Sequence, residues 1–132
     1  MQYEPHLDRP ALIDLATMRY FGSVDRKDMA ATLDCFHDGA LLCVQTEFTL
    51  HAGKAAIGKM FEDFFNAYAS IVHKDFVCTV DEKNGRITAS FEAVLTADDG
   101  NDTRLFNTNF WRIRDGKFQE VYVYFSGANV LV

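Results

Sequence analysis

The sequence predicts an α+β fold in which three helices of the N-terminal half cover a strongly curved, mostly antiparallel mixed sheet. Helical spacing of apolar residues fills the first half of the chain, whereas β-branched and aromatic runs separated by turn residues fill the second half. Helices segregated from a later run of strands are typical of α+β proteins. No helical segment falls between the later strands, so we expect them to pair antiparallel.

The length and composition indicate one folded domain that spans residues 1–132. A chain of 132 residues buries about two-thirds of its unfolded surface, which is enough for a real core. Hydrophobic residues make up 48% of the chain and aromatic residues 14%. This bulky apolar mass exceeds what a minimal core requires, and it suits an internal ligand pocket or a subunit interface.

Three segments carry helical spacing. Asp8 and Pro10 mark the start of the first helix, and we expect it to end near Gly22. Asp25 is the predicted cap of a second helix, which residues 37–39 close. The third segment has the clearest pattern, an aromatic face at helical spacing formed by Ile57, Met60, Phe61, Phe64, Phe65, Tyr68 and Ile71.

Two short strands are predicted at residues 40–46 and 48–50, where apolar runs are too short for a helix. Four longer strands follow, and turn sequences such as Asn84-Gly85 and Asp115-Gly116 separate them. Their predicted ranges are residues 72–81, 86–97, 103–114 and 117–126.

Both faces of the last predicted strand are apolar. Val121, Val123 and Phe125 point to one side, whereas Tyr122 and Tyr124 point to the other. One face belongs to the core, and no helix remains to cover the second face. The pattern therefore predicts a homodimer formed through the outer face of the sheet.

The charge and the N-terminus restrict the possible partners and location. A net charge of -6 without any basic run lacks the footprint of nucleic-acid binding. The same charge disfavours an anionic membrane surface, and no apolar run is long enough to span a bilayer. Residues 1–6 have neither the basic flank nor the apolar stretch of a signal peptide, so we expect a cytoplasmic protein.

The cysteines and histidines do not indicate a metal site. Cys35, Cys43 and Cys78 lack C-x-x-C spacing, and we interpret them as reduced thiols. His37 and His51 fall at the ends of predicted elements without the paired spacing of metal ligands. We therefore expect neither a metal nor another cofactor.

Several motifs follow the order of the predicted elements. They are Met18-Arg19-Tyr20, Val24-Asp25, the stretch from Phe36 to Ala40, and the C-terminal residues 124–130. Together they resemble the nuclear-transport-factor-two-like superfamily, which includes ketosteroid isomerases and SnoaL-like polyketide cyclases. The resemblance covers nearly the whole chain and implies a cone-shaped α+β barrel with an internal apolar pocket.

The resemblance to ketosteroid isomerases also implies site residues. In those enzymes a tyrosine and an aspartic acid donate hydrogen bonds to the substrate carbonyl, and a carboxylate moves the proton. Tyr20 matches the tyrosine, and Asn109 takes the place of the aspartic acid. The base position falls on Val44, which cannot accept a proton. His73 is the candidate replacement because imidazole titrates near neutrality, and Asp75 shares its predicted strand face.

Inward-facing positions supply the rest of the predicted pocket, although each of these side chains also suits ordinary core packing. Tyr20 has the same structural alternative, a buried ring with one partner for its hydroxyl. Asn107 and Asn109 also have a purely structural alternative, since buried amides can hydrogen-bond to each other or to an ordered water. The predicted pocket residues are Phe36, Val44, Phe61, Phe91, Asn107, Trp111 and Val123.

The sequence leaves three functions open. A cofactor-independent isomerase, dehydratase or cyclase acting on a hydrophobic carbonyl compound would use Tyr20 and Asn109 to polarise oxygen and His73 as the base. A pocket that binds a hydrophobic small molecule without changing it is favoured by the missing carboxylate at Val44. A dimerising interaction module would use only the outer face of the sheet.

Overall fold

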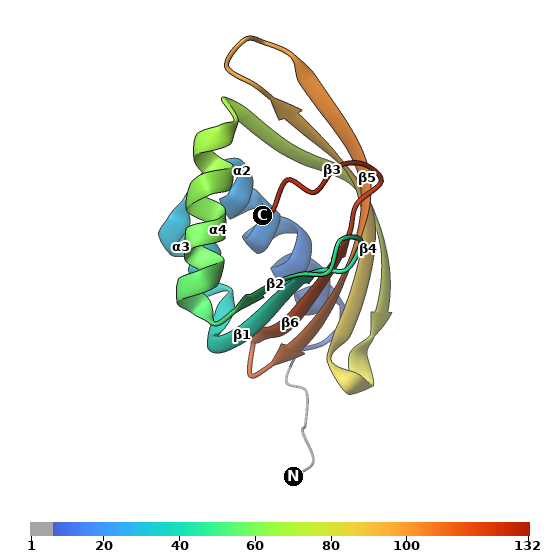
Figure 1. Cartoon of the computed structure of the whole chain (residues 1–132). Helices are drawn as coiled ribbons and strands as arrows, with labels where there is room; N and C mark the ends of the chain where they lie inside the picture. The colour runs from blue at the N-terminus through green and yellow to red at the C-terminus, as the bar shows by residue number, and fades with distance from the viewer. Residues whose placement is uncertain (1–6) are drawn as a thin grey trace.

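The computed structural model describes residues 7–132. Residues 1–6, in which we find no signal-peptide character, lie outside the described residues. Helices pack against one face of a curved six-stranded sheet, and the opposite face carries no helix (Figure 1). The predicted α+β class is therefore confirmed.

The N-terminal helix is longer than predicted. Its first part, α1 (Arg9–Ile13), continues without a break through the π-helical η1 (Asp14–Tyr20) into α2 (Phe21–Asp25). Asp8 caps its start, since its carboxylate accepts a hydrogen bond from the Ala11 backbone N–H at 3.0 Å. The predicted end near Gly22 is wrong, because a single glycine inside a helix costs only about 1 kcal/mol relative to alanine.

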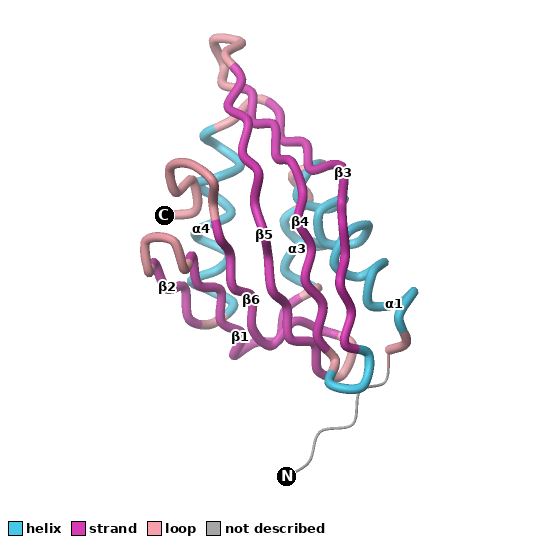
Figure 2. Tube along the Cα trace, turned by 90° about the vertical axis from the view of Figure 1, so that its right-hand side faces the viewer, coloured by secondary structure: helices cyan, strands magenta, loops and turns pink. Residues whose placement is uncertain are grey.

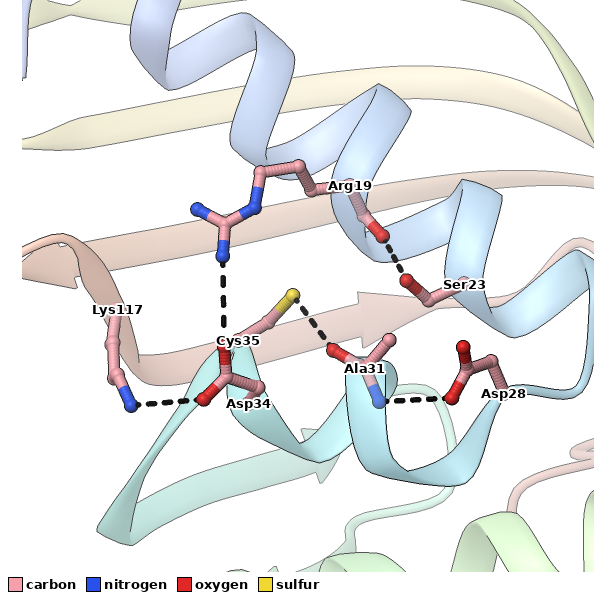
Figure 3. Close-up of polar contacts among 7 residues, drawn as sticks. All are labelled: Arg19, Ser23, Asp28, Ala31, Asp34, Cys35 and Lys117. Carbon is pink, nitrogen blue, oxygen red and sulfur yellow. Dashed lines mark hydrogen bonds and ion pairs between the residues drawn. The ribbon is translucent and has the colours of Figure 1, made fainter.

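The next helix, α3 (Met29–Asp34), begins at a different cap from the one predicted. Asp28 caps this helix by accepting a hydrogen bond from the Ala31 backbone N–H at 3.1 Å, whereas Asp25 ends α2. Figure 3 shows Asp34 between Lys117 and Arg19, with N–O distances of 3.4 and 3.9 Å.

The predicted closure of α3 at residues 37–39 is also wrong. The chain leaves the helix at Cys35, whose carbonyl accepts a hydrogen bond from the Phe118 backbone N–H at 2.7 Å. This bond starts the pairing of the first strand with the last, so Phe36 already belongs to the sheet.

The sheet has the strand order β2-β1-β6-β5-β4-β3, and Figure 2 shows it face on. The β1 and β6 strands pair parallel and all other neighbours pair antiparallel, as predicted for a mostly antiparallel mixed sheet. The β2 and β3 strands lie at opposite edges, so the sheet is open and the predicted barrel is not closed. The strands are β1 (Phe36–Val44), β2 (Thr49–Ala52), β3 (Ser70–Asp81), β4 (Arg86–Thr96), β5 (Asp102–Arg114) and β6 (Lys117–Tyr124), with the short η2 (Glu82–Asn84) between β3 and β4.

The aromatic helix is α4 (Lys54–Ala67), which stands at the left in Figure 1, opposite the curved sheet. Its predicted apolar face is buried up to Phe65. The helix ends earlier than predicted, because Tyr68 is extended, its carbonyl accepts a hydrogen bond from the Lys27 ammonium, and Ile71 lies in β3.

The core lies between the helices and the concave face of the sheet. Its largest fully buried side chains include Trp111, Phe36, Phe61 and Phe118. The three cysteines are free thiols. Within residues 7–132, no helix is long and apolar enough to cross a membrane.

Candidate active site

A small cavity lies within the core. Its volume is about 30 Å³, and about 400 Å³ of atom-free space lies between its walls when the open mouth is included. Four polar side chains reach it, those of Tyr20, His73, Asn107 and Asn109. The rest of the lining is apolar and consists of Phe21, Val24, Phe61, Phe64, Phe91, Ala93, Leu95, Leu105, Val123, Phe125, Val130 and Leu131.

His73 forms a hydrogen-bonded pair with Asp25. One carboxylate oxygen of Asp25 lies 2.6 Å from His73 Nδ1, and the other accepts the His73 backbone N–H at 2.9 Å. The two side chains are 8% and 24% exposed, respectively. Because a carboxylate only accepts, this pattern places the imidazole proton on Nδ1 and leaves Nε2 of the neutral ring free to take a proton.

Aromatic rings hold the imidazole in place. The His73 ring stacks on Phe21 with a centroid distance of 4.1 Å and an interplanar angle of 23°, and Phe91 lies 5.5 Å away. Phe21 directly follows the π-helical segment and Asp25 ends the same helix, so one helix supplies both the stacking surface and the carboxylate.

A β-bulge separates His73 from its predicted neighbour. The register of β3 against β4 shifts between Lys74 and Val77, and Asp75 has a left-handed φ of 60°. Phe76 turns inward and stacks on Phe21 at 5.5 Å, whereas Asp75 is exposed. The prediction that Asp75 shares the face of His73 is therefore wrong, because the bulge interrupts the alternation.

Tyr20 lies at the end of the π-helical segment and is 2% exposed. Its ring makes edge contacts with Phe36, Phe118 and Trp111. Burial, and to a lesser extent the neighbouring Cys35, raises the pKa of Tyr20 far above its ordinary value. The phenol therefore keeps its proton at neutral pH and is available as a hydrogen-bond donor.

The two asparagines of β5 differ in their bonding. The Asn107 side-chain oxygen accepts the Ser126 backbone N–H at 3.3 Å. The Asn109 side-chain oxygen is buried and has no hydrogen-bond partner among the residues described. Leaving such a group unpaired costs about 1–3 kcal/mol. Asn109 as a residue lines the cavity.

The structure brings most predicted site residues together. Tyr20, His73 and Asn109 line one cavity, as do the predicted pocket residues Phe61, Phe91, Asn107 and Val123. Three others are buried in the core and do not line it, namely Phe36, Val44 and Trp111.

Asp25 is the residue that sequence reasoning missed, because its position fits a helix cap equally well. The Val24-Asp25 motif was its only sequence signal. Over the described part of the chain, no group of three or more histidine, cysteine or acidic side chains is arranged to hold a metal ion.

This open, curved α+β sheet with a cavity under its helices belongs to the nuclear-transport-factor-two-like class. A model of the SnoaL-like domain matches residues 18–121, and the chain belongs to this family. None of the curated proteins compared with the chain matches it.

Solved structures with the same fold carry several different names. A protein from Novosphingobium aromaticivorans, provisionally named an aromatic ring hydroxylase, is 24% identical with a TM-score of 0.79, and the match covers 92% of this chain and 90% of that one. A provisionally named polyketide cyclase from Xanthomonas campestris is 20% identical with a TM-score of 0.75, over 88% and 90% of the two chains.

SalBIII, described as an epoxide hydrolase/cyclase-like enzyme in pyran ring formation in salinomycin, is 15% identical with a TM-score of 0.79, over 90% and 93% of the two chains. At these identities the likeness shows the shared fold. Since the names differ among proteins of one fold, the chemistry of this chain has to be argued from its own site.

Proposed function

We propose that this protein catalyses cofactor-independent proton transfer on a small, neutral, hydrophobic carbonyl compound, as an isomerase, dehydratase or cyclase. The observation that carries the proposal is that His73, which lines a mostly apolar cavity, is paired with Asp25 behind it. A buried imidazole whose proton is fixed on Nδ1 by a carboxylate is arranged to act as a general base through Nε2.

The proposed reaction begins when Nε2 of His73 removes a proton from the carbon next to the carbonyl. The electron pair of the broken C–H bond forms the double bond of an enolate, and negative charge develops on the carbonyl oxygen. The Tyr20 hydroxyl and the Asn109 amide N–H groups stabilise that oxygen by hydrogen bonding. The imidazolium then returns the proton, either to another carbon or to a departing hydroxide.

The lining of the cavity favours a neutral substrate. Among residues 7–132, no lysine or arginine lines it, and the whole chain carries a net charge of -6. An anionic substrate would lose its hydration there without gaining a counter-charge, which is costly in an apolar site. We therefore expect uncharged ketones to bind in preference to keto acids.

Hydrogen–deuterium exchange tests this proposal without knowledge of the natural substrate. The protein is incubated in D₂O with a panel of neutral cyclic ketones such as cyclohexanone and 2-decalone, and proton NMR follows loss of the signals next to the carbonyl. We expect exchange faster than in buffer for at least one ketone, and none for 4-oxocyclohexanecarboxylate. Ketone binding without faster exchange would instead indicate a non-catalytic ligand-binding protein.

We also propose that two chains associate through the outer face of the sheet to form a homodimer. Phe106, Phe110 and Tyr124 are 67%, 44% and 46% exposed on this face. Phe110 and Tyr124 contact each other edge to face at 5.7 Å, and the Arg112–Glu120 ion pair lies beside them. An apolar centre flanked by both signs of charge is self-complementary under a two-fold axis.

Replacing Phe110 with glutamate is expected to convert the dimer to a monomer, because it places a charge at the centre of the apolar surface. Light scattering should give twice the 15.0 kDa chain mass for the wild type and the single mass for the variant. Met18→Glu, at a residue 66% exposed on the helical side, serves as the control and should stay dimeric. A monomeric wild type at micromolar concentration would contradict the proposal.

A further inference from the structure

The cavity as it stands is too small for the ketones considered above. Its volume of about 30 Å³ is far below the roughly 150 Å³ of an engineered apolar cavity that binds benzene. A wall must therefore move before an organic ligand enters, and the walls differ in how firmly they are held.

The weakest wall is the segment 125–131, which follows β6 and is neither helix nor strand. In Figure 1 the end of the chain, drawn in red, folds back between α4 and the sheet. Of the sixteen residues that line the cavity, thirteen are buried, and Phe125 and Val130 are two of the three that are partly exposed. The third is His73 on β3, so this segment supplies most of the partly exposed lining.

Side chains, rather than a backbone ladder, hold the segment in place. Near its start, the Phe125 and Ser126 backbone N–H groups donate to Thr46 Oγ1 and Asn107 Oδ1 at 2.8 and 3.3 Å. Near its end, the Asn129 amide donates to Thr49 Oγ1 at 3.2 Å.

The last of these anchors is His51, whose Nε2 donates to the Leu131 carbonyl at 2.9 Å. Within residues 7–132, no backbone-to-backbone hydrogen bond ties residues 125–131 to another element. Gly127 allows the segment to lie flat on the cavity wall, since a Cβ there would come 2.9 Å from Leu105 Cδ2.

We infer that residues 128–131 form a gate and that Val130 and Leu131 set the size of ligand that the closed site accepts. Loss of the His51 and Thr49 contacts lets this part swing outward, while the anchors at Thr46 and Asn107 hold the start of the segment. The inference rests on the proposed function only in its premise that a ligand enters, and the opening itself is measurable without a substrate.

The single tryptophan of the chain provides that measurement. Trp111 is 2% exposed and contacts the cavity residues Phe21 and Tyr20, with centroid distances of 5.8 and 6.3 Å. Acrylamide, a small neutral quencher, reaches it by way of the cavity when the gate opens. We expect the variant His51→Ala/Thr49→Val to show a severalfold larger acrylamide quenching constant than the wild type.

A second variant separates gate opening from general loosening of the fold. Ile57→Val shortens a fully buried side chain of α4 that does not line the cavity, and melting temperatures are measured for both variants. We expect acrylamide to quench Trp111 in Ile57→Val as it does in the wild type. The gate inference would be overturned if the double variant had the wild-type quenching constant, or if the quenching constant of Ile57→Val rose equally.

The outcome is independent of the ketone experiment. Raised quenching in the double variant together with no ketone exchange by the wild type would keep the gate and remove the catalytic proposal. Ketone exchange by the wild type together with wild-type quenching in the double variant would keep the catalytic proposal and remove the gate.

Discussion

Replacing His73 with glutamine is expected to abolish nearly all of the catalysed exchange of ketone protons. A general base contributes about 10²–10⁴-fold to such a step, and the neutral amide of glutamine has no site of comparable basicity. Asp25 does not take over, because both of its oxygens are bonded to His73 in the wild type and it does not line the cavity. The fall should appear in kcat while KM changes little, since Tyr20 and Asn109 still bind the ketone oxygen.

The same substitution at a second histidine provides the matched control. His37 lies on β1 away from the cavity, where its Nε2 bonds the Arg114 carbonyl at 2.5 Å. We expect His37→Gln to exchange ketone protons at the wild-type rate. Full exchange by His73→Gln would rule out His73 as the base.

Replacing Asp25 with asparagine should lower the exchange rate, because it favours the His73 tautomer whose proton is on Nε2 and which cannot act as the base. His73 presents two donors to Asp25, its backbone N–H and its Nδ1–H, and a carboxylate accepts both. Asparagine has only one acceptor oxygen. When that oxygen bonds the backbone N–H, the amide NH₂ faces Nδ1 and drives the ring proton to Nε2. A comparable change in a serine protease triad lowers kcat about 10⁴-fold, and we expect a loss of about 10²–10⁴-fold here.

Nitrogen-15 NMR of the two ring nitrogens measures the tautomer directly and needs no substrate. The wild type should show a protonated Nδ1 on neutral His73, and Asp25→Asn a protonated Nε2. The control is Asp38→Asn, a fully exposed carboxylate whose partner is Lys54 at 3.7 Å, which should leave both the tautomer and the exchange rate unchanged. An Nδ1-protonated ring in Asp25→Asn would contradict the proposed role of the carboxylate.

The sequence predicts the fold well where local chemistry decides it. The buried aromatic face of α4 is confirmed, as are the later strands to within two residues of each bound. Gly85 and Gly116, which have left-handed φ angles of 65° and 77°, separate strands at the predicted turns. The second helix was misplaced because Asp25 and Asp28 both suit a cap, and contact with β3 decides between them.

The site is harder to predict, because strand alternation fixes the face of a residue but not its place along the strand. On β5, Asn107, Asn109 and Trp111 all point inward, yet only the two asparagines reach the cavity. On β6, Val123 lines it. The His73–Asp25 pair joins residues 48 positions apart, and the neighbouring bulge in β3 leaves no mark in the apolar pattern.

The alternation of β5 has a consequence for how such a protein diversifies. Asn107 and Asn109 are buried on the cavity side, whereas Phe106 and Phe110 are exposed on the opposite side. A mutation at an even-numbered position of this stretch alters the outer surface and leaves the inner side chains in place, and the converse also holds. Selection can therefore act on assembly and on ligand choice through interleaved, separately mutable positions of one strand.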